Sequence, residues 1–186
     1  MTRIVAGTAG GRRLRVPPAG TRPTSDRVRE ALFSVLHARM DFDGARVLDL
    51  YAGSGALGLE ALSRGASHAL LVESDKKAAA IIRGNIGDLG LPGAELRPGA
   101  VASVLAGPPP ERYDLIFSDP PYAFDITDVL SDLRALVSGN WLHEGAIVVV
   151  ERSLRSPELS WPPEFSALKS RTYGETRIDL AEYEPV

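Results

Sequence analysis

From residue 45 onward, short apolar runs alternate with stretches whose apolar residues recur at helical spacing. Such runs predict buried strands, and the stretches between them predict helices. Strands are expected at Arg46 to Tyr51, His68 to Glu73, Glu95 to Arg97, Tyr113 to Ser118 and Gly145 to Glu151, with helices at Ala56 to Arg64 and Lys76 to about Leu89. Because apolar strands interleaved with helices form a mostly parallel sheet covered on both faces, the pattern indicates a doubly wound α/β fold.

The N-terminal segment departs from this pattern. Arg3 to Ala6 and Arg12 to Val16 flank a glycine-rich turn and predict a basic β-hairpin. A proline-containing linker follows, and then a helix from about Asp26 to Met40 that Thr24 or Ser25 can cap. We therefore expect a separate hairpin arm with its linker at the start of the chain.

The C-terminal segment also departs from the alternation. Ala167 to Tyr173 and Thr176 to Glu182 flank Gly174 and Glu175, which predicts a terminal antiparallel hairpin. A chain of 186 residues is about one domain by length. The expected organisation is an arm and linker at residues 1–23, followed by one α/β domain at residues 24–186.

Charge is distributed unevenly along the chain. Residues 1–40 contain eight arginines, no lysine and only two acidic residues, whereas the net charge of the whole chain is −3. A basic arm on an acidic body indicates an anionic partner, and arginine suits forked contacts with phosphate. The alternative is an ordinary solvated surface.

Several classes of protein are excluded or disfavoured by composition. The chain has no cysteine, so it has neither disulfides nor thiolate ligands, and its three histidines show no metal-ligand spacing. No apolar run is long enough for a membrane span, and the N-terminus lacks a signal-peptide pattern. We expect a cytoplasmic protein, monomeric, without metal and without a membrane partner.

A glycine-rich turn between the first parallel strand and its helix indicates a nucleotide-type cofactor. Residues 53–58 read Gly-Ser-Gly-Ala-Leu-Gly, and Glu73 ends the next strand, where a carboxylate can accept both ribose hydroxyls. This fingerprint fits a dinucleotide or S-adenosylmethionine. Asp49, inside the strand before the turn, favours S-adenosylmethionine, because a carboxylate there would repel a pyrophosphate; it could instead only cap the loop.

The sequence Asp119-Pro120-Pro121-Tyr122 follows the apolar strand at Tyr113 to Ser118 and indicates amine chemistry. The Asp119 carboxylate and the Pro120 carbonyl could each accept one N–H of an exocyclic amine. That would turn the nitrogen lone pair towards a methyl donor. The prolines hold these acceptors rigidly, and Tyr122 offers a face on which an extruded base could stack. A plain strand-end turn is the structural alternative.

With these motifs the chain resembles the RsmD family, the bacterial methyltransferases that modify a guanine N2 in 16S ribosomal RNA. The resemblance covers nearly the whole length and rests on four blocks. They are residues 3–7 with 11–14, Arg22-Pro23-Thr24-Ser25-Asp26-Arg27-Val28-Arg29-Glu30-Ala31-Leu32-Phe33, residues 49–61, and Ser118-Asp119-Pro120-Pro121-Tyr122. The second block is the discriminating one, because many methyltransferases share the last two.

The resemblance implies a fold, a donor and a substrate. The fold is the class I methyltransferase fold, a Rossmann-like seven-stranded sheet with an antiparallel last strand, preceded by an arm that contacts RNA. The donor is S-adenosylmethionine, and the substrate is 16S rRNA within an assembled or partly assembled small ribosomal subunit. The implied cofactor residues are Asp49, Tyr51, Gly53, Ser54, Gly55, Glu73, Ser74 and Ala100, the catalytic residues are Asp119, Pro120, Pro121 and Tyr122, and the RNA-binding residues are Arg12, Arg13, Arg15, Arg22, Arg27 and Arg29.

One segment departs from related enzymes, which often place Asp or Asn after the third strand to contact the adenine amine. Here residues 97–101 read Arg-Pro-Gly-Ala-Val, so the backbone at Ala100 is the expected contact. Three other readings remain open. They are a methyltransferase for another amine (adenine N6 in DNA, guanine in transfer RNA, or a protein glutamine), an NAD-dependent oxidoreductase, and a non-catalytic RNA-binding assembly factor.

Overall fold

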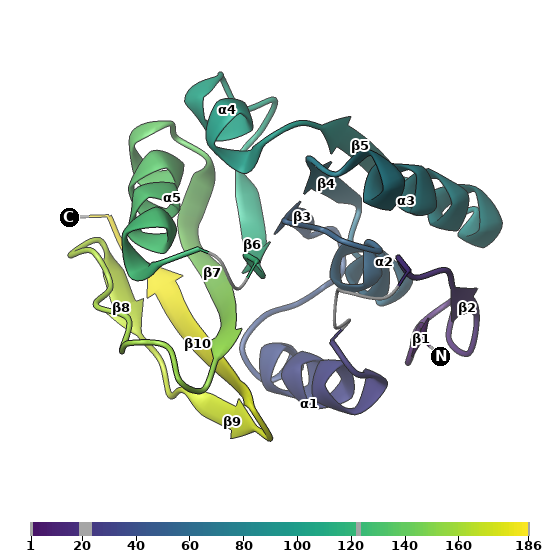
Figure 1. The fold of residues 1–186 in the computed structure, drawn as a ribbon, viewed down its shortest axis with the longest axis horizontal. Coiled ribbons are helices and arrows are strands. Elements are labelled where there is room, and N and C mark those ends of the chain that lie inside the picture. The colour runs from purple at the N-terminus through teal and green to yellow at the C-terminus, as the bar shows by residue number, and fades with distance from the viewer. Residues whose placement is uncertain (1, 19–23, 122–123, 186) are drawn as a thin grey trace.

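A single twisted sheet organises the chain in the computed structural model, which describes residues 2–18, 24–121 and 124–185. Figure 1 shows the sheet crossing the molecule, with helices on both faces. In sheet order the strands are β5 (Ala94–Pro98), β4 (His68–Glu73), β3 (Arg46–Leu50), β6 (Tyr113–Ser118), β7 (Leu142–Ser153), β10 (Thr176–Tyr183) and β8 (Phe165–Ala167), and β9 (Arg171–Tyr173) also pairs with β10. The strands from β5 to β7 are parallel, and β10 is antiparallel to both β7 and β8.

The predicted class of fold, with an antiparallel last strand, is therefore confirmed. β3 and β6 are direct neighbours, with Leu50 opposite Ser118. Their carboxyl ends, and the loops that follow them, lie side by side. Parallel sheets of this kind bind ligands outside the carboxyl ends of their strands.

Some predicted boundaries are wrong. The segment Ala167 to Tyr173 is not one strand: β8 and β9 pair with opposite ends of the long β10, and the chain leaves the sheet between them. The first helix, α1 (Asp26–His37), ends before Met40, whose amide still bonds back to Leu36. Two helices were not predicted from the sequence, α4 (Val101–Ala106) and α5 (Ile126–Ser138).

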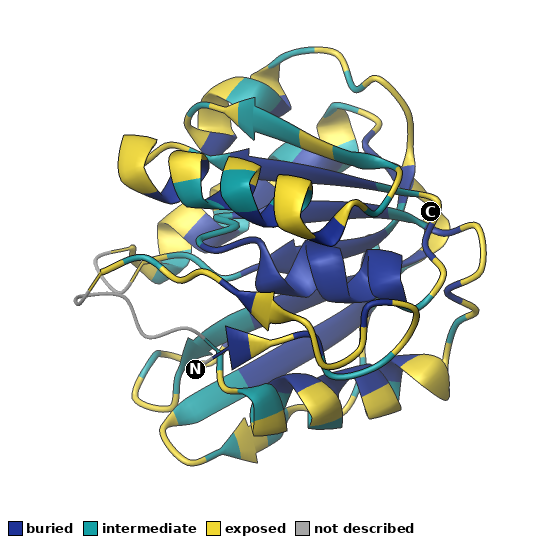
Figure 2. Cartoon of the chain, turned by 90° about the vertical axis from the view of Figure 1, so that its right-hand side faces the viewer, coloured by how far each residue is buried: buried dark blue, intermediate teal, exposed yellow. Residues whose placement is uncertain are grey.

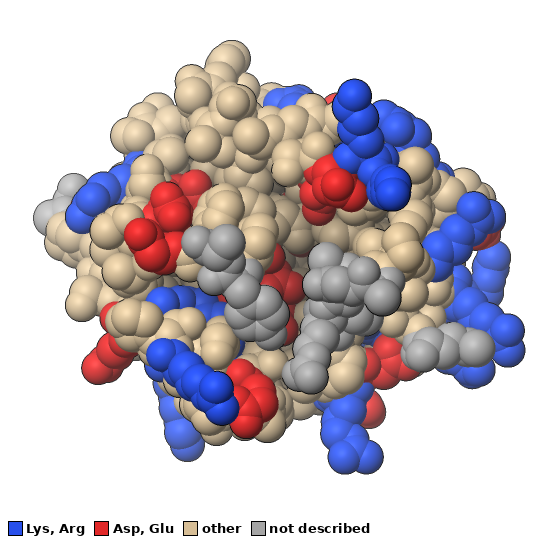
Figure 3. Space-filling model, in the orientation of Figure 1, with Lys and Arg blue, Asp and Glu red and all other residues tan. Residues whose placement is uncertain are grey.

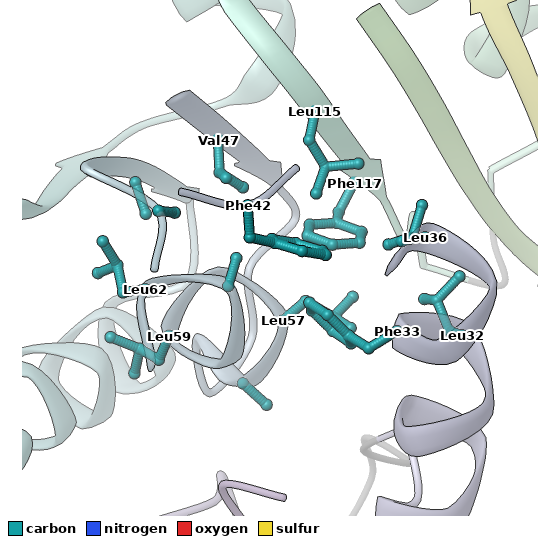
Figure 4. Close-up of a cluster of buried hydrophobic side chains, with 14 of the residues drawn as sticks. Leu32, Phe33, Leu36, Phe42, Val47, Leu57, Leu59, Leu62, Leu115 and Phe117 are labelled. Carbon is teal, nitrogen blue, oxygen red and sulfur yellow. The ribbon is translucent and has the colours of Figure 1, made fainter. Parts of the chain in front are cut away.

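Two apolar clusters fill the space between the helices and the sheet. The first lies between the sheet and α1, α2 (Ala56–Ser63) and α3 (Lys76–Leu89); the second lies under α4 and α5. Figure 4 shows Phe117 and Leu115 of β6 facing Phe33 and Leu36 of α1 in the first cluster. α1 thus packs directly behind the strand that precedes Asp119.

The predicted hairpin is present and covers α2. Its strands, β1 (Thr2–Arg3) and β2 (Arg13–Leu14), are shorter than predicted. Every residue of α2 is buried, and Figure 2 shows this helix as a continuous dark-blue element behind the hairpin. Gly7, with φ of +85°, approaches α2 so closely that a Cβ there would lie 1.9 Å from the Ser63 carbonyl oxygen.

A buried ion pair fastens the hairpin to α1 and α2. Glu60 and Arg29 are both fully buried, and the Arg29 Nε lies 3.4 Å from Glu60 Oε1. The same carboxylate accepts the backbone amides of Val5 (2.8 Å) and Ala6 (3.1 Å) and the Nε of Arg64 (2.9 Å). The hairpin, α1 and α2 therefore form one packed unit.

Candidate active site

The glycine-rich turn is held by two carboxylates. Asp49, which is buried on β3, accepts the Gly58 amide of α2 at 3.0 Å. Glu73, at the end of β4, accepts the Gly53 amide at 2.8 Å. A Cβ on Gly58 would lie 2.3 Å from Leu71 Cδ2, so glycine allows α2 to approach the sheet. These contacts place the turn at the carboxyl ends of β3 and β4.

Burial makes Asp49 a much weaker acid than an exposed aspartate. Removal from water raises the pKa of Asp49 from 3.8 to about 8, the Gly58 hydrogen bond opposes this, and the negative charge of Glu73 adds to it. Asp49 thus carries a proton over much of the neutral range. Its role in holding the turn by a hydrogen bond does not require a permanent negative charge.

A cavity of about 200 Å³ opens beside the turn. Its lining includes the predicted cofactor residues Tyr51, Ser74 and Ala100, together with Phe124 and Asp132 of the region from β6 to α5. The Tyr51 ring packs edge-on against Phe124, with 5.2 Å between the ring centroids, and its hydroxyl donates to the Asp132 carboxylate. The cavity is therefore lined by the two aromatic residues Tyr51 and Phe124 and by residues that follow β4 and β5.

Burial and this hydrogen bond shift the acidities of both side chains. Desolvation raises the pKa of Tyr51, and so does its hydrogen bond to Asp132. Desolvation also raises the pKa of Asp132, although the Tyr51 hydroxyl opposes that shift. The pair leaves the tyrosine neutral, so the ring offers an uncharged stacking surface.

A second group of acids lies at the ends of β6 and β7. Asp119 directly follows Ser118, whose register partner on β7 is Val150, so Asp119 lies level with Glu151, two residues before β7 ends. Their side chains are hydrogen-bonded to each other, and Thr24 Oγ1 donates to Glu151 Oε2 at 2.7 Å. Burial raises the pKa of Asp119 well above its ordinary value, and Glu151 and Asp49 raise it further when they are charged. Burial also raises the pKa of Glu151.

The predicted catalytic residues are only partly described by the structure. Asp119 and Pro120 are partly buried, and Pro121 is exposed and accepts the Phe124 amide at 2.9 Å. Tyr122 lies outside the described residues. The rigid turn after β6 thus begins beside the glycine-rich turn after β3.

The predicted RNA-binding arginines fall into different environments. Arg12, Arg13, Arg15 and Arg27 are exposed. Arg15 pairs with Asp88 at the C-terminal end of α3, at 3.0 Å, and Arg12 donates to the Asp88 carbonyl oxygen. Arg22 lies outside the described residues.

Arg29 does not fit the predicted contact with RNA. It is fully buried, and its guanidinium bonds to Glu60, to Asp26 at 2.9 Å and to the carbonyl oxygen of Arg3. A side chain that is completely enclosed and paired in this way has no donor left to present at the surface. Its role is to join the hairpin to α1 and α2.

Three residues of the site were missed in the sequence: Glu151, Thr24 and Asp132. Glu151 had a signal, since it is an acidic residue that ends an apolar strand, as Glu73 does. Thr24 was considered only as a helix cap, but Ser25 performs that function by accepting the Val28 amide at 3.2 Å. Asp132 lies on an unpredicted helix, so nothing marked it.

The described residues contain no cluster of His, Asp or Glu suited to a metal ion. Within the same residues, every helix is too short or too polar to cross a bilayer. These two findings add no further restriction on the chemistry.

Comparisons with known proteins agree with the motifs. Residues 2–182 match the model of the family described as "Conserved hypothetical protein 95". The "Ribosomal RNA small subunit methyltransferase D" of Escherichia coli (strain K12) is 36% identical over 185 residues, which are 98% of this chain and 90% of that protein. The protein of the same name from Haemophilus influenzae is 36% identical over 176 residues, 92% of this chain and 89% of that protein.

The fold is shared as well. The solved structure "Putative methyltransferase yhhF from Escherichia coli" superposes with a TM-score of 0.88 at 34% identity, covering 100% of this chain and 99% of that one. Family model, relatives and structure agree over nearly the full length. The chain therefore belongs to the family described as "Conserved hypothetical protein 95", the RsmD family of methyltransferases.

Proposed function

We propose that this protein transfers a methyl group from S-adenosylmethionine to the exocyclic N2 amine of a guanine in 16S rRNA. Family membership and the names of the relatives support rRNA as the substrate class. The observation that carries the proposal is the register of β3 and β6, because it sets the glycine-rich turn beside Asp119 and Pro120. A donor on the first segment would then face an amine on the second.

The cavity beside the glycine-rich turn fits a nucleoside of the donor's kind. Gly53 has open space where a Cβ would be, so a ligand could approach its backbone closely. Glu73 uses one bond from each oxygen on the amides of Gly53 and Asp75, which leaves lone pairs for ribose hydroxyls. The remaining residues proposed to hold the donor are Asp49, Tyr51, Ser54, Gly55, Ser74 and Ala100.

The neutral Tyr51 ring would stack on the purine, and the Ala100 backbone would meet its edge. When bound, S-adenosylmethionine supplies an electrophilic methyl group on a positively charged sulfur. Asp119 and the Pro120 carbonyl accept the two N–H groups of the amine and so orient its lone pair. Tyr122 provides the stacking face for the base. Together these groups supply orientation and electrostatic stabilisation.

RNA binding is proposed for the surface around the hairpin. Arg12, Arg13 and Arg15 are exposed there, and Figure 3 shows basic side chains gathered at the side of the molecule formed by the hairpin and α3. Arg27, on α1, is exposed as well. Residues 1–23 would act as the RNA-contacting arm of a methyltransferase domain at residues 24–186.

The proposed working form is a cytoplasmic monomer that acts on an assembled or partly assembled small ribosomal subunit. A shaped particle presents unpaired bases on a fixed surface, and RNA is commonly recognised in that way. A small basic surface would then be sufficient for positioning.

The test uses S-adenosylmethionine with a labelled methyl group and small ribosomal subunits that lack the modification. After the reaction the RNA is digested to nucleosides and separated. Label in N2-methylguanosine is the expected result. Label in another nucleoside, or in transfer RNA, DNA or protein offered in parallel, would refute the guanine assignment while keeping the donor.

A further inference from the structure

The acidic pair at the ends of β6 and β7 has a structure that the proposed reaction does not by itself require. Amine binding needs one carboxylate, at Asp119, yet Glu151 is hydrogen-bonded to it and Thr24 holds Glu151 at 2.7 Å. Thr24 belongs to the arginine-containing segment at residues 22–33, which leads into α1. The pair is therefore linked to the N-terminal part of the chain.

On the basis of the proposed function, we infer that Glu151 is a positioning residue that shares one proton with Asp119. The pair then takes up the proton that the methylated amine releases. The geometry comes from the parallel register of Ser118 with Val150, which makes the two acids neighbours. Thr24, just before α1, fixes the second acid.

The surroundings keep a proton on this pair. Asp49 on β3 disfavours ionisation of Asp119 only when it is itself charged, the Thr24 hydroxyl is uncharged, and Ile178, the register partner of Glu151 on β10, is apolar. Burial raises the pKa of both acids. Two neighbouring carboxyls in such a site do not both ionise near neutral pH, so they hold one proton between them.

The proton can be followed through the reaction. The amine nitrogen forms a bond to the methyl carbon while the bond from that carbon to sulfur breaks, with its electron pair staying on sulfur. The nitrogen then loses one proton to Asp119, and Asp119 passes the proton that it shared to Glu151. The pair gains one proton in total and releases it to water when the product leaves.

The test compares Glu151→Gln with Glu144→Gln in the full-length protein. Glu144 is an exposed acid near the other end of β7, so its substitution controls for the change of charge. Turnover on the small-subunit substrate should fall at least about tenfold in Glu151→Gln, within the range of proton-transfer effects, with cofactor affinity nearly unchanged. Glu144→Gln should match the unsubstituted protein.

The pH profile separates proton sharing from a merely structural role. In the unsubstituted protein the acidic limb of the turnover profile reports formation of the singly protonated pair, which the shared proton stabilises, so the limb should move to higher pH in Glu151→Gln. Unchanged turnover and profile would overturn the inference. A loss of activity accompanied by a lower melting temperature and no shift of the limb would also overturn it, in favour of a structural role.

A second measurement needs neither substrate nor variant. Carbon-13 NMR of the protein's carboxyl groups should show Asp119 and Glu151 titrating as a coupled pair, with Asp119 ionising at unusually high pH. Independent titration at ordinary pH would overturn the inference even if Glu151→Gln did not fold. If the unsubstituted protein left rRNA unlabelled, the proposed function would fail, whereas this titration would still report on the pair.

Discussion

Two groups of carboxyl side chains in this protein, one buried and one partly buried, have opposite surroundings. Glu60, under the hairpin, meets two arginines and two backbone amides, so its negative charge is fully compensated. Asp119 and Glu151, at the ends of β6 and β7, face each other, and the donor to Glu151 is a neutral hydroxyl. The Glu60 site joins the hairpin to α1 and α2. The Asp119–Glu151 site holds two acids close together, which destabilises the folded protein.

The difference separates structural from functional acids without reference to any relative. A buried carboxylate that satisfies its lone pairs with cations and amides contributes to a specific packing arrangement. Acids whose side chains lie next to each other, and whose pKa values are raised as a result, are typical of sites that transfer protons. Asp49 is intermediate, because it is buried with a raised pKa but holds the Gly58 amide.

The largest effect on stability is expected from Arg29→Ala. It would leave the buried Glu60 without its partner on α1, which should lower the free energy of unfolding by about 3–5 kcal/mol. Arg27→Ala, an exposed neighbour on the same helix, is the matched control and should be nearly neutral. Denaturant unfolding measures both. Equal stability of the two variants would show that the Glu60 site does not hold the hairpin to the helices.

Asp119→Ala should lower activity strongly and stability little, which is the reverse of the effect expected for Arg29→Ala. Turnover should fall by about 10²–10³-fold, because the acceptor that orients the amine is lost. The free energy of unfolding should stay the same or rise, since the substitution removes an acid whose ionisation is disfavoured in the folded protein. Methyl transfer, cofactor affinity and melting temperature would be measured together. Full turnover in this variant would remove Asp119 from the reaction, and a stability loss comparable to that of Arg29→Ala would abolish the contrast between the two sites.

The pH dependence of stability tests the intermediate case, Asp49. Its folded-state pKa of about 8 exceeds the ordinary value of 3.8, so between these values the unfolded chain has lost a proton that the folded protein keeps. Stability should therefore fall as pH rises through this window. Asp49→Asn cannot titrate, so its stability relative to the unsubstituted protein should improve by about 3–4 kcal/mol from pH 5 to pH 8. Parallel stability curves would contradict the raised pKa.

The smallest effect concerns the exposed arginines, which contrast with the buried Arg29. Replacing Arg12, Arg13 and Arg15 by Gln should leave stability within about 0.5 kcal/mol, since these are surface positions. RNA affinity should decrease, and its dependence on salt should weaken by roughly two to three counterions. Binding titrations at several salt concentrations provide the test. An unchanged salt slope would place the RNA contact elsewhere.

Much of the fold followed from local pattern. The parallel strands at Tyr113–Ser118 and His68–Glu73 begin and end where their apolar runs do. α5 was not predicted, although Asp125 and Asp128 form a capping box at its start and its apolar residues have helical spacing. The C-terminal hairpin was divided differently because β10 is long enough to pair with β8 and β9 at separate ends.

The chain by itself determined the fold class, the glycine-rich turn and the proline-containing motif that starts at Asp119, because each depends on residues that are close in sequence. Only the tertiary structure decided which charges are structural and which are available. Arg29 resembled its exposed neighbours in sequence, yet packing encloses it against Glu60, and Glu151 became part of the site only when β6 and β7 aligned. Burial and pairing between distant segments set these roles, and neither is encoded in local spacing.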